Sequence, residues 1–496
     1  MVSSFFFEFF KPYIIKFMTE KIRKKLSDSK AARWSALSIV SITMFAGYFL
    51  TDAMSPLKPM LESQFGWSST SYGIFTSAYG WFNIFLLMLI FGGIILDKMG
   101  ARFTGLMSSG IMVTGAALKY WAVSHPTLDV INLPFDVSMN AQVLYASLGF
   151  AIFGVGVEIA GITVSKIIVR WFKGHELALA MGVQVGLARL GTMLALFAPI
   201  PLANLFASKH TQVVNGTLVE KMAPSISAPI AFALVLLAIG FISFFVYIGM
   251  DRKLDASEEK LESSEDDSFK FSDIVQIMGN VGFWLIAILC VLFYSSVFPF
   301  IKYATDLMVN KYGLSMEIAS RIPMCLPLGT LLLTPVFGHI YDKKGKGATI
   351  MIIGAALILF VHSVFSLHVP FLNNWLIALT LVILLGVALS LVPSAMWPSV
   401  AKIIPERQLG TAYSLIFWIQ NWGLAGVPLL IGYVLDQSNP EVLAAKAAGE
   451  VPPLYDYTNP MLIFAGLGFL AIIFGLILKA VDKRKGYGLE EANIKE

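Results

Sequence analysis

Long apolar runs separated by short polar segments occupy almost the whole chain, and they lack the strict alternation that a half-buried strand requires. A helix of about 20 apolar residues crosses the roughly 30 Å of hydrocarbon in a bilayer with its backbone hydrogen bonds satisfied internally. The pattern therefore predicts twelve membrane-spanning helices. We expect them at residues 35–54, 72–95, 103–123, 141–169, 178–200, 229–250, 281–304, 319–341, 348–368, 374–401, 411–435 and 461–481.

A charged segment divides these spans into two sets of six. Hydrophobic residues make up 57% of the chain and charged residues 14%, with a mean hydropathy of +0.74, which is too apolar for a soluble domain. The dividing segment is rich in glutamate, aspartate and serine, a composition that stays solvated. We expect an all-α membrane protein with an N-terminal segment 1–33, a six-helix bundle 34–250, an acidic linker 251–273, a second bundle 274–482 and a tail 483–496.

Basic residues predict the orientation of the spans. Lysine and arginine concentrate before residue 34, in every second loop and after residue 482, so both termini and the linker are expected in the cytoplasm. The formal charge of +4 thus reflects topology, and no nucleic-acid partner is indicated. We interpret the aromatic and basic segment 1–33 as an uncleaved interfacial helix. Cys290 and Cys325 fall within predicted spans, which favours two small core residues over a disulfide framework.

One short string occurs twice, about half a chain apart, each time at the end of an apolar run. The string at 93–102 returns in altered form at 338–347, and this repeat indicates a duplicated architecture. An aspartate at this place can latch the two halves together on the cytoplasmic side, while the glycines permit tight turns. The alternative is that the charges only set topology. The residues concerned are Gly93, Asp97, Lys98, Gly100 and Arg102 in the first copy and Gly338, Asp342, Lys343 and Gly345 in the second.

A second register supports the duplication independently. At one constant offset, the fourth and fifth predicted spans align with the tenth and eleventh, so that Gly154 falls on Gly386 and Gly191 on Gly423. Parallel repeats of this kind are related by an axis along the membrane normal, and they place a substrate site between the halves near the bilayer midplane. We therefore expect two pseudo-symmetric bundles with a central site.

Glu158 and Arg189 are the main candidates for that site. Ionisable groups at mid-bilayer are costly and usually face a cavity or one another. Both residues lie about equally far from the turn near Gly174, so they sit at similar depth on antiparallel helices. A carboxylate and a guanidinium at one depth suit a zwitterion, because the first holds an ammonium and the second grips a carboxylate. The alternative is a structural ion pair that fixes helix packing.

Other polar or aromatic residues in the spans are secondary candidates. Asp52 can be a gate or a solvated helix end, and Trp397 can wall the cavity or simply pack. Gln420 and Asn421 can read a peptide bond or bond a neighbouring helix.

The duplicated loop resembles the signature of the major facilitator superfamily. Further strings are similar to the lysosomal dipeptide transporter group of that superfamily, in which the residues matching Glu158 and Arg189 contact the dipeptide termini, transport is uniport and an accessory glycoprotein is a partner. Lys302 and Arg321 depart from the animal members of the group. The strings are 153–158, 171–177, 188–191, 297–300, 397–398 and 408–413.

These patterns predict a carrier that moves dipeptides by alternating access, working as a monomer in the lipid bilayer, with coupling to protons left open. We expect no cofactor, no metal and no enzymatic activity. An organic-anion carrier that uses Arg189, Lys302 and Arg321 as a cationic cluster is one alternative, and a receptor or scaffold that does not transport is another. The segment before residue 34 has no acidic dileucine address, so we expect a prokaryotic cytoplasmic membrane and no accessory glycoprotein.

Overall fold

The computed structural model describes residues 26–125, 130–133, 137–214, 217–257 and 271–494. Residues 1–25 of the predicted interfacial segment and 258–270 of the acidic linker lie outside this range. The end of the interfacial segment, from Lys30, belongs to the first long helix. In the first half the helices are α2 (Lys30–Asp52), α3 (Lys58–Phe65), α4 (Ser69–Ser77), η2 (Ala78–Gly80), α5 (Trp81–Phe85), α6 (Met88–Val123), α7 (Ala141–Phe172), α8 (Leu177–Phe197), α9 (Pro199–Leu205) and α10 (Ser227–Ser257), after a short η1 (Leu26–Asp28).

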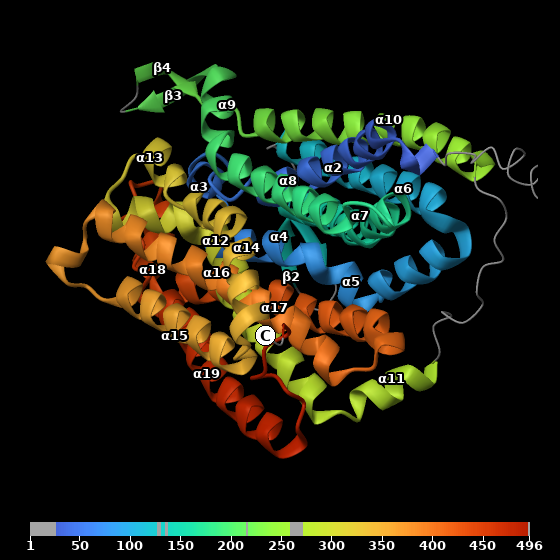
Figure 1. Cartoon of the computed structure of the whole chain (residues 1–496). Helices are drawn as coiled ribbons and strands as arrows, with labels where there is room; N and C mark the ends of the chain where they lie inside the picture. Colours follow the sequence, from blue (N-terminus) through green and yellow to red (C-terminus); the bar gives the residue numbers. More distant parts are fainter. Residues whose placement is uncertain (1–25, 126–129, 134–136, 215–216, 258–270, 495–496) are drawn as a thin grey trace, which may run out of the picture.

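The second half is also helical (Figure 1). Its elements are α11 (Phe271–Met278), α12 (Val281–Tyr312), α13 (Met316–Arg321), α14 (Cys325–Lys344), α15 (Gly347–Ser366), η4 (Pro370–Leu372), α16 (Trp375–Ile403), η5 (Glu406–Gln408), α17 (Leu409–Ser438), α18 (Pro440–Ala448) and α19 (Thr458–Lys485). Two antiparallel hairpins interrupt the helices of the first half, β1 (Val130–Leu133) with β2 (Val137–Asn140) and β3 (Ser208–Val214) with β4 (Thr217–Ala223).

The predicted all-α membrane fold is confirmed. Ten described helices are long and apolar enough to cross a membrane, and a further bent pair, Ser69–Phe85 with Met88–Val123, passes the same test. That pair contains two predicted spans, 72–95 and 103–123, because the chain leaves the helical conformation at Gly100. Gly100 has φ 78°, which a residue with a side chain adopts only with strain. The helix α10 continues to Ser257, so Asp251 is helical and buried, contrary to its expected place in the linker.

The predicted internal repeat is visible in matching helix contacts. A side chain on Gly154 of α7 would overlap the carbonyl oxygen of Tyr79, and Gly386 of α16 makes a looser but still tight approach to the backbone of Leu326 at the start of α14, where a Cβ would lie 3.2 Å from the carbonyl oxygen. Gly191 of α8 approaches the backbone of α2, and its counterpart Gly423 of α17 approaches Ser295 of α12. Close approach at equivalent places in both halves explains why glycine stands at these positions.

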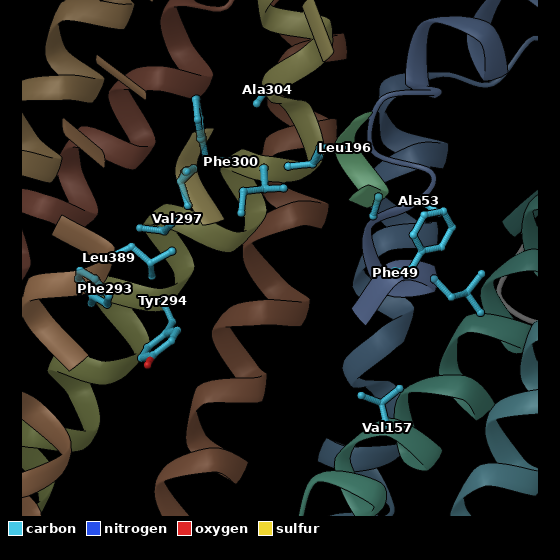
Figure 2. Packing of buried hydrophobic residues seen from close by; sticks show 14 of the residues in the cluster. Phe49, Ala53, Val157, Leu196, Phe293, Tyr294, Val297, Phe300, Ala304 and Leu389 are labelled. Atoms are coloured by element: carbon cyan, nitrogen blue, oxygen red, sulfur yellow. The ribbon is translucent and has the colours of Figure 1, made fainter. Parts of the chain in front are cut away.

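One apolar cluster runs through the interior of both halves. Figure 2 shows some of its members, with Phe49 and Ala53 on α2 and Phe293 and Phe300 on α12. Cys290 is a fully buried member, whereas Cys325 is only partly buried, and both are free thiols. The core therefore gives each bundle a rigid apolar centre, against which the polar side chains of the interface are held.

The two ends of the molecule differ in how the halves are joined. We call the end with α3, α13, α18 and both hairpins the hairpin end, and the end with residues 93–102 and 338–347 the repeat-loop end. Cross-half ion pairs occur at the hairpin end, such as Asp52–Lys302 and Lys58–Asp306. Toward the repeat-loop end, a hydrogen bond from Trp418 Nε1 of α17 to the carbonyl oxygen of Ile84 of α5, at 3.2 Å, joins the halves, but no ion pair does so within the described residues. The described ion pairs between the halves therefore lie at the hairpin end.

Candidate functional site

Glu158 is held by a tyrosine from a neighbouring segment. The hydroxyl of Tyr79, in η2, donates to Glu158 Oε1 at 2.9 Å. This contact depends on Gly154, one turn before Glu158 on α7, because only a glycine lets η2 come close enough for the tyrosine to reach the carboxylate. Glu158 is half-buried and has no ion-pair partner in the described part of the chain. Its charge is therefore available to a ligand.

Arg189 lies where the two halves meet. Its guanidinium carbon is 5.9 Å from the ring centroid of Tyr48 on α2 and 5.7 Å from that of Phe298 on α12. Cation–π contacts of this kind orient a guanidinium without neutralising it. Among the described residues no carboxylate lies within 4 Å of Arg189, so the structural ion pair with Glu158 is not formed. Tyr48 is within electrostatic range of Arg189, Glu158 and Asp52, which shows that these groups surround one region.

The second half contributes aromatic side chains next to Arg189. Phe298 stacks on Tyr294 with ring centroids 5.5 Å apart, and the Tyr294 hydroxyl accepts a hydrogen bond from Trp397 Nε1 at 3.2 Å. Trp397 also packs against Phe417, with the two ring centroids 5.0 Å apart. The half-buried Trp397 thus belongs to an aromatic wall that begins at Arg189. At this site the first half contributes the charges of Glu158 and Arg189, and the second half contributes the aromatic wall of Phe298, Tyr294 and Trp397.

The amides have local partners. Gln420 Oε1 is 3.5 Å from the thiol of Cys290, and Asn421 Nδ2 donates to the carbonyl of Phe417 at 2.9 Å. Gln420 therefore contacts a neighbouring helix, α12, whereas Asn421 bonds a carbonyl one turn back on its own helix, α17. The roles of both amides toward a substrate stay a prediction. Asn421 Oδ1 is buried and has no hydrogen-bond partner, so this amide keeps one acceptor free.

The three cations of the anion-carrier alternative are not gathered into a cluster. Lys302 is paired with Asp52, and Arg321 is exposed on α13, with its guanidinium carbon 5.8 Å from the ring centroid of Phe197. Arg321 is outside the group of residues around Tyr48. The expectation that Arg321 lines the central site is not supported by this arrangement, because the residue lies on a short helix at the hairpin end.

Asp52 and Lys302 form a buried link between the halves. Lys302 Nζ is 2.6 Å from Asp52 Oδ1 and 2.6 Å from the carbonyl oxygen of Thr51. The side chain of Asp52 is 5% exposed and that of Lys302 12%, so water screens their attraction weakly. Asp52 is therefore neither a solvated helix end nor a free binding group in this conformation. It is a cross-half contact.

A second and larger ion network lies beside this pair. Lys58 of α3 is fully buried and bonds Glu62 at 2.5 Å and Asp306 of α12 at 2.6 Å. Glu62 in turn bonds Lys446 of α18 at 2.7 Å. Two cations and two anions alternate in this network, and two of its three ion pairs cross between the halves. Such an arrangement satisfies the charges that burial would otherwise make costly.

Electrostatics keep Glu62 and Lys58 ionised within this network. Burial disfavours the carboxylate of Glu62, but the ammonium groups of Lys58 and Lys446 outweigh burial and hold the pKa of Glu62 below its ordinary value. Burial likewise disfavours the Lys58 ammonium, yet Asp306 and Glu62 raise the pKa of Lys58 well above its usual range. Both groups are therefore charged at neutral pH.

Asp436 adds a contact between the halves at the start of α4. Its carboxylate oxygens accept hydrogen bonds from the backbone N–H groups of Ser69 at 3.1 Å and Thr70 at 2.6 Å. The first N–H groups of a helix have no intrahelical partner and favour a negative charge. A carboxylate of α17 thus caps a helix of the other half.

The two repeat loops make contacts within their own halves. Asp97 pairs with Lys166 at 2.7 Å, and Arg102 bonds the buried Asp251 at 2.6 Å. Asp342 Oδ1 accepts a hydrogen bond from Asn493. Lys98 and Lys343 are exposed. Neither loop latches the halves in this conformation, because Asp97 and Asp342 make no hydrogen bond or ion pair to the other half within the part of the chain that the structure describes.

The glycines of the repeat serve the predicted turn only in part. Gly100 and Gly345 have positive φ angles of 78° and 66°. Gly93 and Gly338 lie within helices, and a Cβ at either would have no neighbour within 4 Å. The expectation that all four glycines permit a turn or close approach is therefore wrong for these two.

Two clefts lie away from the centre. One of about 380 Å³ is at the repeat-loop end, lined by Asn280, Lys485 and Tyr487 among others, and one of about 220 Å³ is at the hairpin end beside Lys311 and Tyr457. Neither contains Glu158 or Arg189. The candidate central site is thus defined by its half-buried charges and rings.

A family model decides the identity of the fold. The model described as Major Facilitator Superfamily matches residues 38–428, which is most of the chain. The chain belongs to the major facilitator superfamily. It is therefore a membrane transporter, and the resemblance found in the repeat loops is confirmed.

Among individual relatives, the human protein named lysosomal dipeptide transporter MFSD1 is 28% identical over 413 residues, covering 82% of this chain and 80% of the relative. The chicken protein of the same name is 32% identical over 293 residues, or 58% of this chain and 62% of the relative. A rice protein named probable anion transporter 2, chloroplastic, is 27% identical over 31% of this chain and 25% of its own length.

Solved transporter structures share the fold at low sequence identity. An inward-facing, unoccupied bacterial homolog to the human lysosomal transporter Spinster has a TM-score of 0.64 and 14% identity, covering 92% of this chain and 98% of its own. The structure of tetrameric PepTSo2 has a TM-score of 0.58 and 16% identity, covering 92% and 99%. These similarities confirm the architecture.

Sequence reasoning missed several residues of the interface. Tyr79, which holds Glu158, and Phe298, which covers Arg189, had no charge to single them out. Lys58, Glu62 and Lys446 lie outside the predicted spans, so the search for ionisable groups inside the membrane did not reach them. The spacing of Lys58 and Glu62 at i and i+4 on a helix was an available signal for their pairing, but nothing local indicated the partners in the other half.

Proposed function

We propose that this transporter moves dipeptides across the membrane, with Glu158 binding the substrate ammonium and Arg189 its carboxylate. The observation that carries the proposal is that Arg189 lies where the two halves meet and pairs with no carboxylate of the described chain. Glu158, in the same region around Tyr48, is oriented by Tyr79 and also has no cationic partner among the described residues. Opposite charges that do not neutralise each other suit a ligand that carries both.

The similarity to the lysosomal dipeptide transporters of human and chicken supports the choice of substrate. A dipeptide separates its ammonium and carboxylate by a peptide unit, whereas an amino acid carries both on one carbon. The aromatic wall of Trp397, Tyr294 and Phe298 then offers apolar surface to the substrate side chains. The charges of the first half would recognise the termini, and the rings of the second half would contact the rest.

Transport would proceed by alternating access. The cross-half ion pairs at the hairpin end must break for the site to open there, and substrate binding would shift the balance between the two states. As the hairpin end opens, the repeat-loop end would close, and Asp97 would leave Lys166 for the facing end of the other half. The positive-inside expectation places this repeat-loop end in the cytoplasm.

Uptake by proteoliposomes tests the proposal with matched substrates. We would compare a dipeptide, its N-acetyl derivative and its C-terminal amide, each with and without a pH gradient. A charge-assisted hydrogen bond contributes about 1.5–3 kcal/mol, so losing one terminus should reduce uptake by about tenfold or more. In Glu158→Gln the penalty for N-acetylation should shrink, and in Arg189→Ala the penalty for amidation should shrink.

Two control variants distinguish the loss of substrate contacts at the site from a general effect of removing a charge. Arg321→Ala and Glu176→Gln remove charges of the same kinds outside the site, and both should keep uptake within about twofold. Dicarboxylates should compete poorly, whereas strong competition that also depends on Arg321 would favour the anion carrier. If dipeptides neither enter the liposomes nor raise the thermal stability of the protein, the proposed function is wrong.

A further inference from the structure

The chain after α19 folds back over the repeat-loop end of its own half. Figure 1 shows this segment turning from the end of α19 toward the other helices of that half. Leu489 is fully buried, and its backbone N–H donates to Asp482 Oδ1 at 3.1 Å. Lys402, near the end of α16, donates to the carbonyl oxygens of Gly488 at 3.0 Å and Glu491 at 2.7 Å. The segment is thus anchored on two different spans.

The same segment pairs with the second repeat loop. The backbone N–H groups of Lys346 and Gly347 donate to the carbonyl oxygens of Glu490 at 3.0 Å and Leu489 at 2.8 Å. The carboxylate of Glu490 accepts from the backbone N–H of Thr349 at 2.9 Å and from its hydroxyl at 2.7 Å. Further along, the N–H groups of Asn493 and Ile494 donate to the carbonyl of Asp342, each at 3.0 Å.

Two features of the repeat loop are explained by this docking. A side chain on Gly345 would overlap the backbone of Glu491, and one on Gly347 would come within 2.9 Å of the Leu489 carbonyl oxygen. Lys346 between them has a φ of 62°, which is unusual for a residue with a side chain. The loop is therefore shaped to receive an extended segment, and its glycines leave the room that the segment fills.

Comparison of the two halves shows what the segment replaces. In the first half, Arg170 at the end of α7 bonds the buried Asp251 of α10 directly at 3.0 Å. At the offset that relates Gly154 to Gly386, Arg170 falls on Lys402, and Asp251 falls one residue past Asp482. Within the described residues no ion pair joins Lys402 to Asp482. The carbonyls of the docked segment bond Lys402, and its N–H bonds Asp482.

We propose that the repeat-loop end of the second half is a binding site for an extended peptide, occupied by residues 486–494 of the chain itself. The ligand class is a short segment with a buried leucine, followed by an acidic residue that bonds Thr349. Occupation joins α12, α14, α16 and α19 into one rigid body, since Tyr487 also bonds Asn280 at the start of α12. The site does not depend on the substrate. Because the docked segment holds the second repeat loop in place, only the first repeat loop, with Asp97, can change partners during transport. This consequence rests on the proposed function.

Thiol labelling in the full-length protein tests the docked state. In purified protein with Cys325→Ser, a cysteine introduced by Leu489→Cys should react with a hydrophilic maleimide at least tenfold more slowly than one introduced by Ile494→Cys, because Ile494 is exposed. Adding Lys402→Met should speed labelling at position 489 and leave labelling at 494 unchanged. Equal rates at both positions in the parent would overturn the proposal.

A peptide added in trans tests the site itself. A chain ending at Lys485 should bind a labelled synthetic peptide of residues 485–496, and the same peptide with Leu489→Asp should bind at least tenfold more weakly. The full-length protein should bind little, since its own segment fills the site. If the shortened chain is monodisperse and unfolds in one cooperative thermal transition but does not bind the peptide, the proposal fails. These readouts use no substrate, so they stand apart from the outcome of the uptake assays.

Discussion

Asp52 of α2 and Lys302 of α12 form an ion pair of 2.6 Å that joins the two halves of the transporter at the hairpin end. Lys302 also bonds the neighbouring carbonyl of Thr51, and its own carbonyl accepts from Tyr72 of α4 at 2.9 Å. One residue of the second half thus holds two helices of the first. Because both side chains are largely shielded from water, the two charges can separate only if water enters or each charge finds a new partner.

Removing one member of this pair should favour opening of the hairpin end. Lys302→Met leaves the Asp52 carboxylate buried without its cation, a change that costs about 3–5 kcal/mol in comparable buried pairs. Spin labels on the two halves at this end should report a longer mean separation in Lys302→Met than in the parent. The exchange variant Asp52→Lys with Lys302→Asp should restore part of the short separation. An unchanged separation in Lys302→Met would show that the pair does not hold the end closed.

The network around Lys58 predicts lower stability in acid. The pKa of Glu62 is held below its ordinary value of about 4.3, so its contribution to stability is present above that value and is lost as the pH falls through the lowered pKa. The pKa of Lys58 is raised, so its contribution is present below the ordinary lysine pKa and is lost only in strong alkali. Thermal unfolding between pH 7 and pH 3 should show the melting temperature falling at the acid end. In Glu62→Gln this fall should be smaller, and an identical fall would exclude Glu62 as its source.

The contact of Gly154 with Tyr79 predicts a sensitive position on α7. Gly154→Ala forces η2 away from α7, and overpacking of this kind costs about 1–3 kcal/mol. It should also move Tyr79 from Glu158 and reduce dipeptide uptake more than stability alone accounts for. The matched control is Gly161→Ala on the same helix, where a Cβ would meet Met44 only at 3.8 Å. Melting temperature and uptake should both stay near the parent in this control.

The two repeat loops should differ in function although their sequences match. Asp97 has an exposed pair with Lys166 and is free to exchange partners, whereas the loop of Asp342 is covered by residues 486–494. Asp97→Asn should reduce uptake by about tenfold or more, the loss expected for one charged contact. Asp342→Asn should stay within about twofold, since backbone hydrogen bonds hold its loop. Equal losses in both variants would indicate two symmetrical latches.

Much of the architecture was predictable because it follows from local sequence. Apolar runs of the right length predicted the spans, and the alignment of Gly154 with Gly386 and of Gly191 with Gly423 predicted the equivalence of the two halves, which the matching helix contacts confirm. At the candidate site, the choice of Glu158 and Arg189 as unusual charges needed only their place in apolar helices. Their roles toward a substrate stay a prediction.

Partner choice was not predictable from the sequence. Lys58 and Asp306 are 248 residues apart in the sequence, so no local pattern indicates that they pair. Asp251 begins the acidic segment predicted as a solvated linker, but the structure extends α10 through it and places it in an ion pair with Arg102. The sequence by itself determined where the membrane helices lie and that they form two related sets, because each span is stabilised by the transfer of its own residues into lipid. Only the tertiary structure decided which charges pair, which glycines admit a neighbour and where residues 486–494 dock. Those outcomes depend on which helix faces meet, and the meeting faces come from segments far apart in the chain.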